Sequence, residues 1–127
     1  MKILVTGDRG YIGAVLTKML LDKSCDVVGY DINYYADNEL YKSDHSYRQI
    51  TKDIRDIAAG DVRGFDAVIH LAGLSNDPLG ALAPHLTEAI NYEGTMRLAR
   101  LAKEAGAGRF IYSSSQSMYG ISNVQGE

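Results

Sequence analysis

Three glycines near the N-terminus have the spacing with the clearest chemical meaning. Gly7, Gly10 and Gly13 lie between an apolar run and a stretch with helical spacing. Gly7 permits a tight turn, Gly10 lets the backbone approach a pyrophosphate, and Gly13 lets a helix pack closely on a strand. A helix that begins here offers unpaired N–H groups to the phosphates. This context favours a dinucleotide site over an ordinary glycine turn, with Tyr11 and Ile12 among the cofactor-binding residues.

The second feature is a carboxylate, Asp31, at the end of the next apolar run. In a dinucleotide site, an acidic residue after the second strand accepts hydrogen bonds from the adenosine ribose hydroxyls and repels a 2′-phosphate. No basic residue occurs at positions 32–37. These observations favour NAD over NADP. The alternative is an aspartate that ends a strand and caps a turn.

The elements that must position these residues alternate along the chain. Short apolar or β-branched runs predict strands at 2–6, 26–30, 47–51, 65–71 and 109–113. Helices are expected at 11–22, at 54–59 up to Gly60, and from Pro84 to Gly106. The segments 32–44 and 73–83 are expected to be loops. The alternation predicts right-handed crossovers and an α/β, doubly wound parallel sheet in the order 3-2-1-4-5.

Two helical stripes are expected to cover this sheet. The first helix has an apolar face made of Ile12, Val15, Leu16, Met19 and Leu20. The last helix has a stripe made of Leu86, Ile90, Gly94, Leu98, Leu101 and Ala105.

The overall composition narrows the class of protein. The chain has 127 residues, enough for one domain, and 46% of them are hydrophobic. A net charge of −3 gives no basic patch for nucleic acid or for a membrane surface. The single cysteine, Cys25, forms no disulfide within the chain and is expected to be half-buried. The first apolar run is too short for a signal peptide or membrane span, so a cytoplasmic location is expected.

Further motifs follow in order along the chain. The segment from Thr6 to Gly13 reads T-G-x-x-G-x-x-G, and Asp53 is followed by Ile54. The next motif is His70-Leu71-Ala72-Gly73, and Asn91 precedes Gly94-Thr95. Finally, Ser113-Ser114-Ser115 precedes Met118-Tyr119-Gly120. With these motifs the chain resembles the NAD-dependent epimerase/dehydratase family of the extended short-chain dehydrogenase/reductase superfamily, which has a Rossmann-like fold.

The resemblance implies a role for each motif. Asp53 and Ile54 would read the adenine, and Leu71, Ala72 and Gly73 would lie along the cofactor. Asn91, Ser113 and Ser114 would also belong to the cofactor site. Ser115 would be catalytic, hydrogen-bonding the reacting hydroxyl or carbonyl of a nucleotide sugar. No metal is implied.

Structural alternatives exist for several of these residues. Asp53 also suits the N-cap of the helix that follows it. The amide of Asn91 is able to bond neighbouring backbone, and Ser113 and Ser114 to satisfy loop backbone. We interpret His70 as a histidine at the edge of the core, with no role in the chemistry.

One expected feature of the family is missing from the sequence. The family transfers protons with a Tyr and a Lys four residues later, but no tyrosine here has Lys at that position. We therefore expect residues 1–127 to be an incomplete NAD-binding domain, truncated after about the fifth strand and without the substrate domain. Alone, it is expected not to be catalytic. Ser75 stands where some sugar epimerases carry Lys, which leaves the subgroup open.

Two other functional hypotheses remain open. One is a non-catalytic dinucleotide sensor that keeps the glycine loop, and the other is a carbonyl reductase of the same fold, against which Asp31 argues. With no further helix expected to cover the fifth strand, the chain is also predicted to self-associate, as a homodimer or otherwise.

Overall fold

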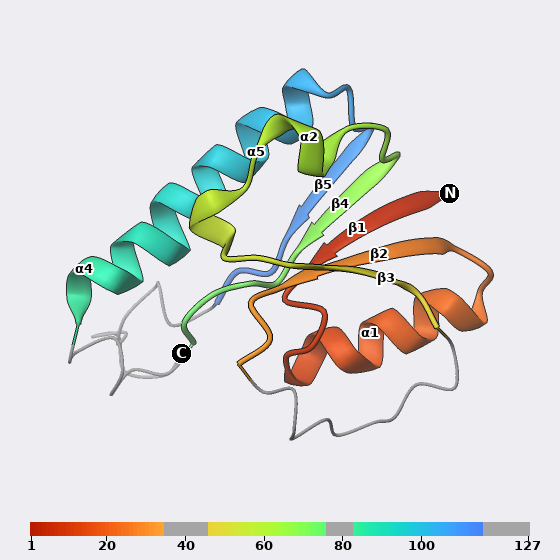
Figure 1. Ribbon diagram of the computed structural model, residues 1–127, viewed down its shortest axis with the longest axis horizontal. Helices are drawn as coiled ribbons and strands as arrows, with labels where there is room; N and C mark the ends of the chain where they lie inside the picture. The colour runs from red at the N-terminus through yellow and green to blue at the C-terminus, as the bar shows by residue number, and fades with distance from the viewer. Residues whose placement is uncertain (35–45, 76–82, 116–127) are drawn as a thin grey trace, which may run out of the picture.

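The computed structural model describes residues 1–34, 46–75 and 83–115 (Figure 1). The strands are β1 (Lys2–Thr6), β2 (Asp26–Asp31), β3 (Arg48–Thr51), β4 (Ala67–His70) and β5 (Arg109–Tyr112). The helical elements are α1 (Tyr11–Asp22), η2 (Ile54–Asp56), α2 (Ala59–Val62), α4 (Pro84–Thr87), η3 (Glu88–Gly94) and α5 (Thr95–Glu104). The predicted strands are therefore all present, and their ends differ from the predicted ones by two residues or fewer.

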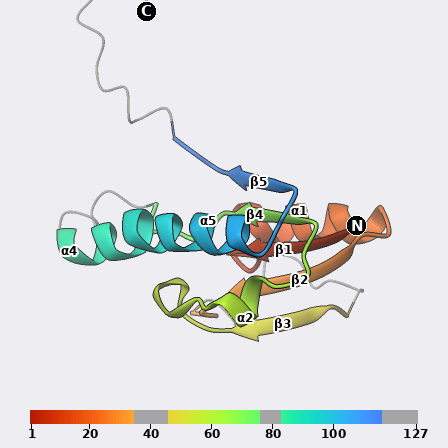
Figure 2. The same cartoon turned by 90° about the horizontal axis from the view of Figure 1, so that it is seen from above.

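The five strands form one sheet in the order β3-β2-β1-β4-β5, and every neighbouring pair is parallel. Figure 2 shows the strands in this order from one edge of the molecule to the other. The predicted α/β class and strand order are confirmed. Because all strands run the same way, the carboxyl ends of β1, β4 and β5 lie at one end of the sheet (Figure 1).

Helices pack on both faces of this sheet, as a doubly wound fold requires. One core layer, around Leu4, Val68 and Leu98, lies between the sheet and the helical elements η2, α2 and α5. The opposite layer contains Ile3, Val5 and Val27 and packs against Leu16 and Leu20 of α1. Cys25 is partly buried against this second layer, in agreement with expectation.

The predicted apolar face of α1 is wrong for three of its residues. Ile12, Val15 and Met19 are exposed, whereas Gly13 and Thr17 are the buried residues of the helix. A Cβ at Gly13 would lie 1.9 Å from the carbonyl oxygen of Gly7, so this side of the helix must face the glycine turn. Close backbone contact, and not apolar periodicity, sets the rotation of α1.

The segment between β3 and β4 also differs from prediction. In place of one helix at 54–59, two short helical turns occur, η2 and α2, separated at Ile57 by an extended backbone. The Asp61 carboxylate accepts a hydrogen bond from the Ala58 N–H at 2.9 Å and so begins the second turn. Gly60, expected to end the helix, lies inside α2, and Gly64 follows that turn with a φ of +79°.

The helix that starts at Pro84 agrees with prediction in extent but not in type. Its middle, η3, is a π-helix, and α5 follows it without a break and ends at Glu104, two residues before Gly106, which has a φ of +78°. Gly94 and Leu98 of the predicted stripe are buried, and Ile90 and Leu101 pack at the edge of the core. The ends of the stripe, Leu86 and Ala105, are exposed.

Candidate functional site

The glycine loop joins β1 to α1 through a turn that only glycine fits at two positions. Gly7 has a φ of +73°, and its N–H donates to the Tyr30 carbonyl at 2.9 Å. A Cβ at Gly7 would meet the backbone nitrogen of Ala72 at 2.7 Å. Gly7 thus forms the tight turn predicted for it, and the turn is packed against the chain that leaves β4.

The helix that follows has a free N-terminus. Gly10 is the N-cap of α1, and no side chain caps the first turn. A Cβ at Gly10 would have one close neighbour, the Gly7 carbonyl oxygen at 3.3 Å. The N-terminal N–H groups and the positive end of the helix dipole suit an anionic group such as a pyrophosphate.

A cavity of about 800 Å³ lies at this end of the sheet. Its walls come from the glycine loop, from the chain after β4, from η3 and from the chain after β5. Among the predicted site residues, those that line it are Gly7, Gly10, Tyr11, Ile12, Gly13, Leu71, Ala72, Gly73, Asn91, Ser113, Ser114 and Ser115. Ser75 lines it too. Segments far apart in sequence therefore meet in one space large enough for a cofactor.

Asp31 lies outside the lining of this cavity, at the end of β2. Its carboxylate accepts a hydrogen bond from the Asn33 N–H at 2.6 Å, and Asn33 has a φ of +65°. The Arg9 N–H faces the other carboxylate oxygen at 3.4 Å. The turn-capping alternative is thus realised, and the carboxylate is held beside the glycine loop, where the ribose role was predicted.

Asp53 and Ile54 are not brought to the cavity by the described structure. The Asp53 carboxylate caps η2 by accepting from the Arg55 N–H at 2.9 Å and also pairs with the Arg55 guanidinium. This hydrogen bonding lowers the pKa of Asp53. Ile54 is a core residue, 6% exposed. The N-cap alternative for Asp53 is realised, and its adenine role stays a prediction.

His70 joins two walls of the cavity through a directed hydrogen-bond chain. Its Nδ1 lies 2.6 Å from the Thr6 hydroxyl and its Nε2 lies 2.7 Å from the Thr95 hydroxyl. Because the Asn91 carbonyl only accepts, the Thr95 hydroxyl donates to it and must accept from Nε2–H. Nε2 of His70 therefore carries a proton, and in the neutral ring the Thr6 hydroxyl donates to Nδ1.

Burial reinforces this state of His70. The side chain is 0% exposed, and burial lowers the pKa of His70 to about 4. The histidine predicted to lie at the edge of the core is thus fully buried. Its ring fixes the ends of β1 and β4 relative to the start of α5.

Asn91 holds the chain that leaves β4. Its Oδ1 accepts from the Leu74 N–H at 2.8 Å and its Nδ2 donates to the Leu74 carbonyl at 2.9 Å. The residue lies in the π-helical segment η3, a form that often marks functional sites. The expected backbone-bonding role is realised, and the same side chain lines the cavity.

The three serines lie at the cavity rim. The Ser113 N–H donates to the His70 carbonyl at 3.2 Å, which extends the pairing of β5 with β4. All three side chains are exposed. The rest of the predicted serine motif, Met118-Tyr119-Gly120, lies outside the described residues.

Sequence reasoning missed several residues of this site. Arg9, Leu74, Thr95 and Tyr112 line the cavity, and Asp8 is buried under the glycine loop. The Thr95 partnership with His70 depends on the packing of α5, which has no local sequence signal. Asp8 had a signal, a charged residue inside a glycine turn, which the prediction left unused.

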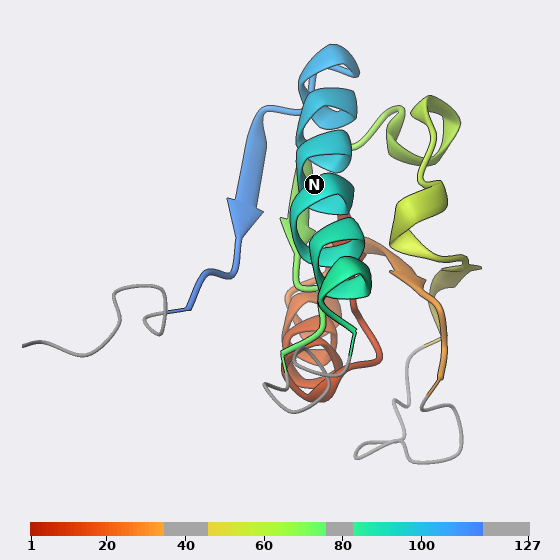
Figure 3. The same ribbon diagram turned by 90° about the vertical axis from the view of Figure 1, so that its left-hand side faces the viewer.

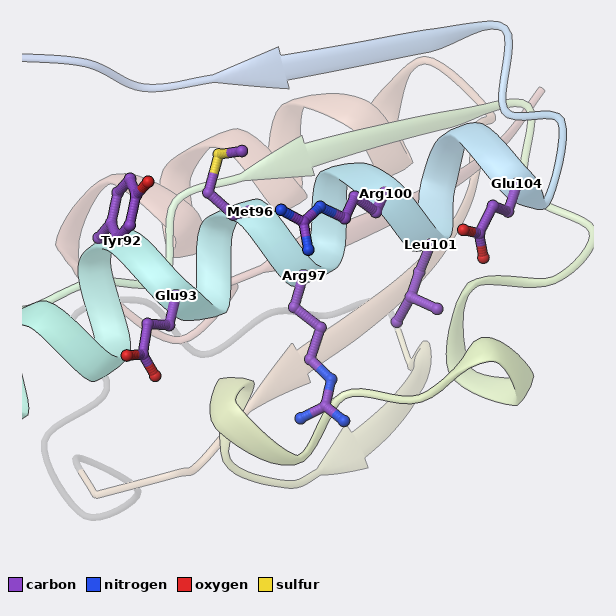
Figure 4. A pocket seen from close by; sticks show the side chains of 7 residues that line it. All are labelled: Tyr92, Glu93, Met96, Arg97, Arg100, Leu101 and Glu104. Atoms are coloured by element: carbon purple, nitrogen blue, oxygen red, sulfur yellow. The ribbon is translucent and has the colours of Figure 1, made fainter.

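A second, smaller hollow of about 320 Å³ runs along η3 and α5 (Figure 4). Tyr92 and Met96 are exposed on its upper side, toward β5 in this view. On its lower side, the Arg97 guanidinium donates to the Arg55 carbonyl at 2.9 Å. Among the described residues, no group of three or more His, Cys, Asp or Glu could hold a metal ion.

The sequence comparisons identify the family. Residues 3–127 match the NAD dependent epimerase/dehydratase family, and the chain belongs to it. A low-salt glycan biosynthesis protein, Agl12, of Haloferax volcanii is 35% identical over 94% of the chain and 41% of its own length. A 3-beta-hydroxysteroid dehydrogenase of Mycolicibacterium neoaurum is 28% identical over 92% of the chain and 32% of its own length.

Solved structures agree with this assignment. A UDP-glucose-4-epimerase from Stenotrophomonas maltophila, crystallised with NAD and formylated UDP-arabinopyranose, superposes with a TM-score of 0.85. It is 26% identical, and the match covers 100% of this chain and 40% of that one. The chain thus spans about two fifths of the length of this neighbour. In the described parts of the chain, no helix is long and apolar enough to cross a membrane.

Proposed function

We propose that this chain is the NAD-binding part of a nucleotide-sugar epimerase or dehydratase. The observation that carries the proposal is one cavity lined both by the glycine loop at the start of α1 and by the serines that follow β5. The first group suits the phosphates of a dinucleotide, and the second offers hydroxyls to a reacting sugar. The family match and the epimerase neighbour with bound NAD support this assignment.

The individual residues have distinct tasks in the proposal. The N–H groups at the first turn of α1 bind the pyrophosphate, which passes close to Gly10, and Asp31 accepts from the adenosine ribose. Asp53 and Ile54 lie at the adenine. The chain from Leu71 to Gly73 lies along the cofactor.

The reacting sugar belongs on the serine side of the cavity. The Ser115 hydroxyl hydrogen-bonds the sugar oxygen whose carbon is oxidised and holds it in place. Bound NAD supplies a hydride acceptor. No tyrosine in the sequence is followed by Lys at the fourth position. We therefore propose that residues 1–127 alone do not turn over nucleotide sugars, and measurable turnover by a preparation of verified mass would disprove this.

The proposal predicts a preference for NAD over NADP. The Asp31 carboxylate repels a 2′-phosphate, so calorimetric titration of the protein should give a lower Kd for NAD. Replacing Asp31→Ala should reduce the difference between the two cofactors. NADP binding as tight as NAD binding would contradict the placement of Asp31.

A second candidate function is a non-catalytic dinucleotide sensor. The lack of a Tyr–Lys pair in the sequence is the observation that favours it. The two functions differ in whether the full product of the gene that encodes this chain oxidises any nucleotide sugar. NAD binding without reduction by a panel of nucleotide sugars would favour the sensor.

Location and assembly complete the proposal. A cytoplasmic location fits the single, half-buried cysteine, and fractionation of cells tests it. Self-association is proposed through the exposed apolar side chains near β5, Tyr92, Met96, Ile111 and Tyr112, which are between 39% and 63% exposed.

A further inference from the structure

A buried carboxylate lies under the glycine loop, at Asp8. The residue is 1% exposed and does not line the cavity. Burial, together with the neighbouring charge of Asp31, raises the pKa of Asp8. Burying a carboxylate in this position costs free energy. Its presence therefore suggests a role that an apolar residue could not fill.

Strand β3 and the residue just before it supply the partners of this carboxylate. The Tyr47 hydroxyl donates to Oδ2 at 2.7 Å, and the Gln49 amide donates to the same oxygen at 2.9 Å. The Gln49 amide also lies 2.8 Å from the Tyr47 hydroxyl, which closes a three-membered cluster. Among the described residues, Oδ1 has no hydrogen-bond partner. Asp8 thus ties the first loop of the chain to its edge strand.

Strand β2 leaves space for the same carboxylate. A Cβ at Gly29 would lie 2.1 Å from Asp8 Oδ2 and 2.4 Å from its Cγ. Gly29 pairs with Gln49 in the sheet, two residues before Asp31. The glycine in β2 is therefore explained by the side chain of Asp8 that packs on it.

The next residue, Arg9, connects this cluster to the end of β2. Its N–H faces Asp31 Oδ2 at 3.4 Å, and its guanidinium donates to the Asn33 side-chain carbonyl. Because Tyr47 and Gln49 fix the Asp8 side chain against the sheet, the neighbouring Arg9 peptide is held next to the Asp31 carboxylate.

We propose that Asp8, held by Tyr47 and Gln49, is a positioning residue that places Arg9 and the Asp31 carboxylate for the adenosine ribose of NAD. This inference rests on the proposed function, because it assigns the ribose to Asp31. Asp8 acts through Asp31 and does not touch the cofactor. Loss of the Asp8 side chain therefore weakens binding of NAD and of ADP-ribose alike, since both contain that ribose.

The charge of Asp8 should also affect how the stability of the protein depends on pH. The groups that face it from the described residues are Asp31 of β2, Gln49 of β3 and Tyr47 just before β3, and Arg9 acts on the Tyr47 hydroxyl. Because its pKa is raised in the fold, the charged form is less favourable there than in the unfolded chain. Relative to Asp8→Asn, the protein should lose stability as the pH rises from 3.8 through the raised pKa.

Calorimetry on a set of variants tests the proposal. Asp8→Ala should raise the Kd for NAD about tenfold or more, whereas Asp8→Asn, which keeps an acceptor for both donors, should stay within about threefold. In the Asp31→Ala background, Asp8→Ala should change the Kd by about twofold or less. Asp61→Asn is the control. The Asp61 carboxylate bonds Lys52 and Ala58 at a place distant from the glycine loop, so this variant should alter stability without altering the Kd for NAD.

A stability measurement covers the case in which Asp8→Ala folds poorly. Gly29→Ala should destabilise the wild-type chain strongly and the Asp8→Ala chain less, because the colliding carboxylate is then absent. An unchanged Kd in Asp8→Ala, or equal effects with and without Asp31, would overturn the positioning role while leaving the proposed function intact. Failure of the wild-type protein to bind NAD would overturn both.

Discussion

The two walls of the cavity are built in different ways. The glycine-loop wall is packed backbone against backbone, with Gly7 and Gly13 in contact and Asp8 and His70 buried beneath it. On the opposite wall, β5 forms the edge of the sheet, and Ile111 and Tyr112 are each 51% exposed (Figure 3). The wall at the glycine loop is therefore buried within the chain, whereas the wall at β5 is exposed.

This difference between the walls indicates where the exact backbone position matters for binding. A pyrophosphate is held by backbone N–H groups, whose position depends on the turn itself, so substitutions there should affect folding or binding sharply. The serine side chains at the rim are exposed instead. Changes on that wall should affect association more than folding.

The largest effect is expected at Gly13. In Gly13→Ala the new Cβ would lie 1.9 Å from the Gly7 carbonyl oxygen, and neither backbone is able to move freely. We expect a loss of about 3 kcal/mol or more in the free energy of unfolding, measured by denaturant titration. Gly60→Ala is the matched control, because a Cβ there meets nothing within 4 Å, and it should leave stability unchanged or raise it. Equal stability of the two variants would contradict the packing.

His70 should make the protein sensitive to acid. Its pKa in the fold is about 4, below the ordinary value of 6.5, so the unfolded chain takes up the proton first. The stability that His70 provides is complete above pH 6.5 and falls between pH 6.5 and 4, by an amount on the order of 3 kcal/mol. Melting curves of the wild type and of His70→Asn across this range measure it. A His70→Asn protein with the same pH dependence would refute the assignment, and His85→Gln is the exposed control.

The exposed wall at β5 should promote self-association of the chain. Exposed apolar side chains at an edge strand favour pairing between copies, so light scattering on a dilute sample should detect species larger than a monomer. Ile111→Ser should reduce this association, whereas Tyr34→Ser, at a residue 75% exposed in the turn after β2, should not. A clean monomer with a cooperative melt would show that the chain covers this wall itself.

The sequence predicted the fold well because its strongest signals are local. Continuous apolar runs marked the buried strands, and Pro84 and Gly106 bounded the last helical stretch. The rotation of α1 escaped prediction because a backbone contact at Gly13 outweighed apolar periodicity. The break at Ile57 depends on the capping bond from Ala58 to Asp61, which the helical pattern concealed.

The candidate site was likewise predictable where its signals are local motifs, and not where it depends on contacts between distant residues. Motifs placed Gly10, Asn91 and the serines around one cavity. The glycine loop and the serines each follow a strand whose carboxyl end lies there, and Asn91 bonds to the chain that leaves β4. The links between motifs were not visible, since the bonds of His70 to Thr6 and Thr95 join residues far apart in sequence. At Asp53 the motif itself was misleading about position, because the residue matches the motif but does not line the cavity.

Gly10→Val tests the central claim most directly. A Cβ at Gly10 has one close protein neighbour, 3.3 Å away, while Gly10 itself lines the cavity, so the added methyl groups should occupy the path of the pyrophosphate. Circular dichroism and calorimetry on the same preparation decide the matter. The account predicts a folded protein with a melting curve close to that of the wild type and no measurable NAD binding. A folded Gly10→Val protein that binds NAD as the wild type does would show that the phosphates lie elsewhere.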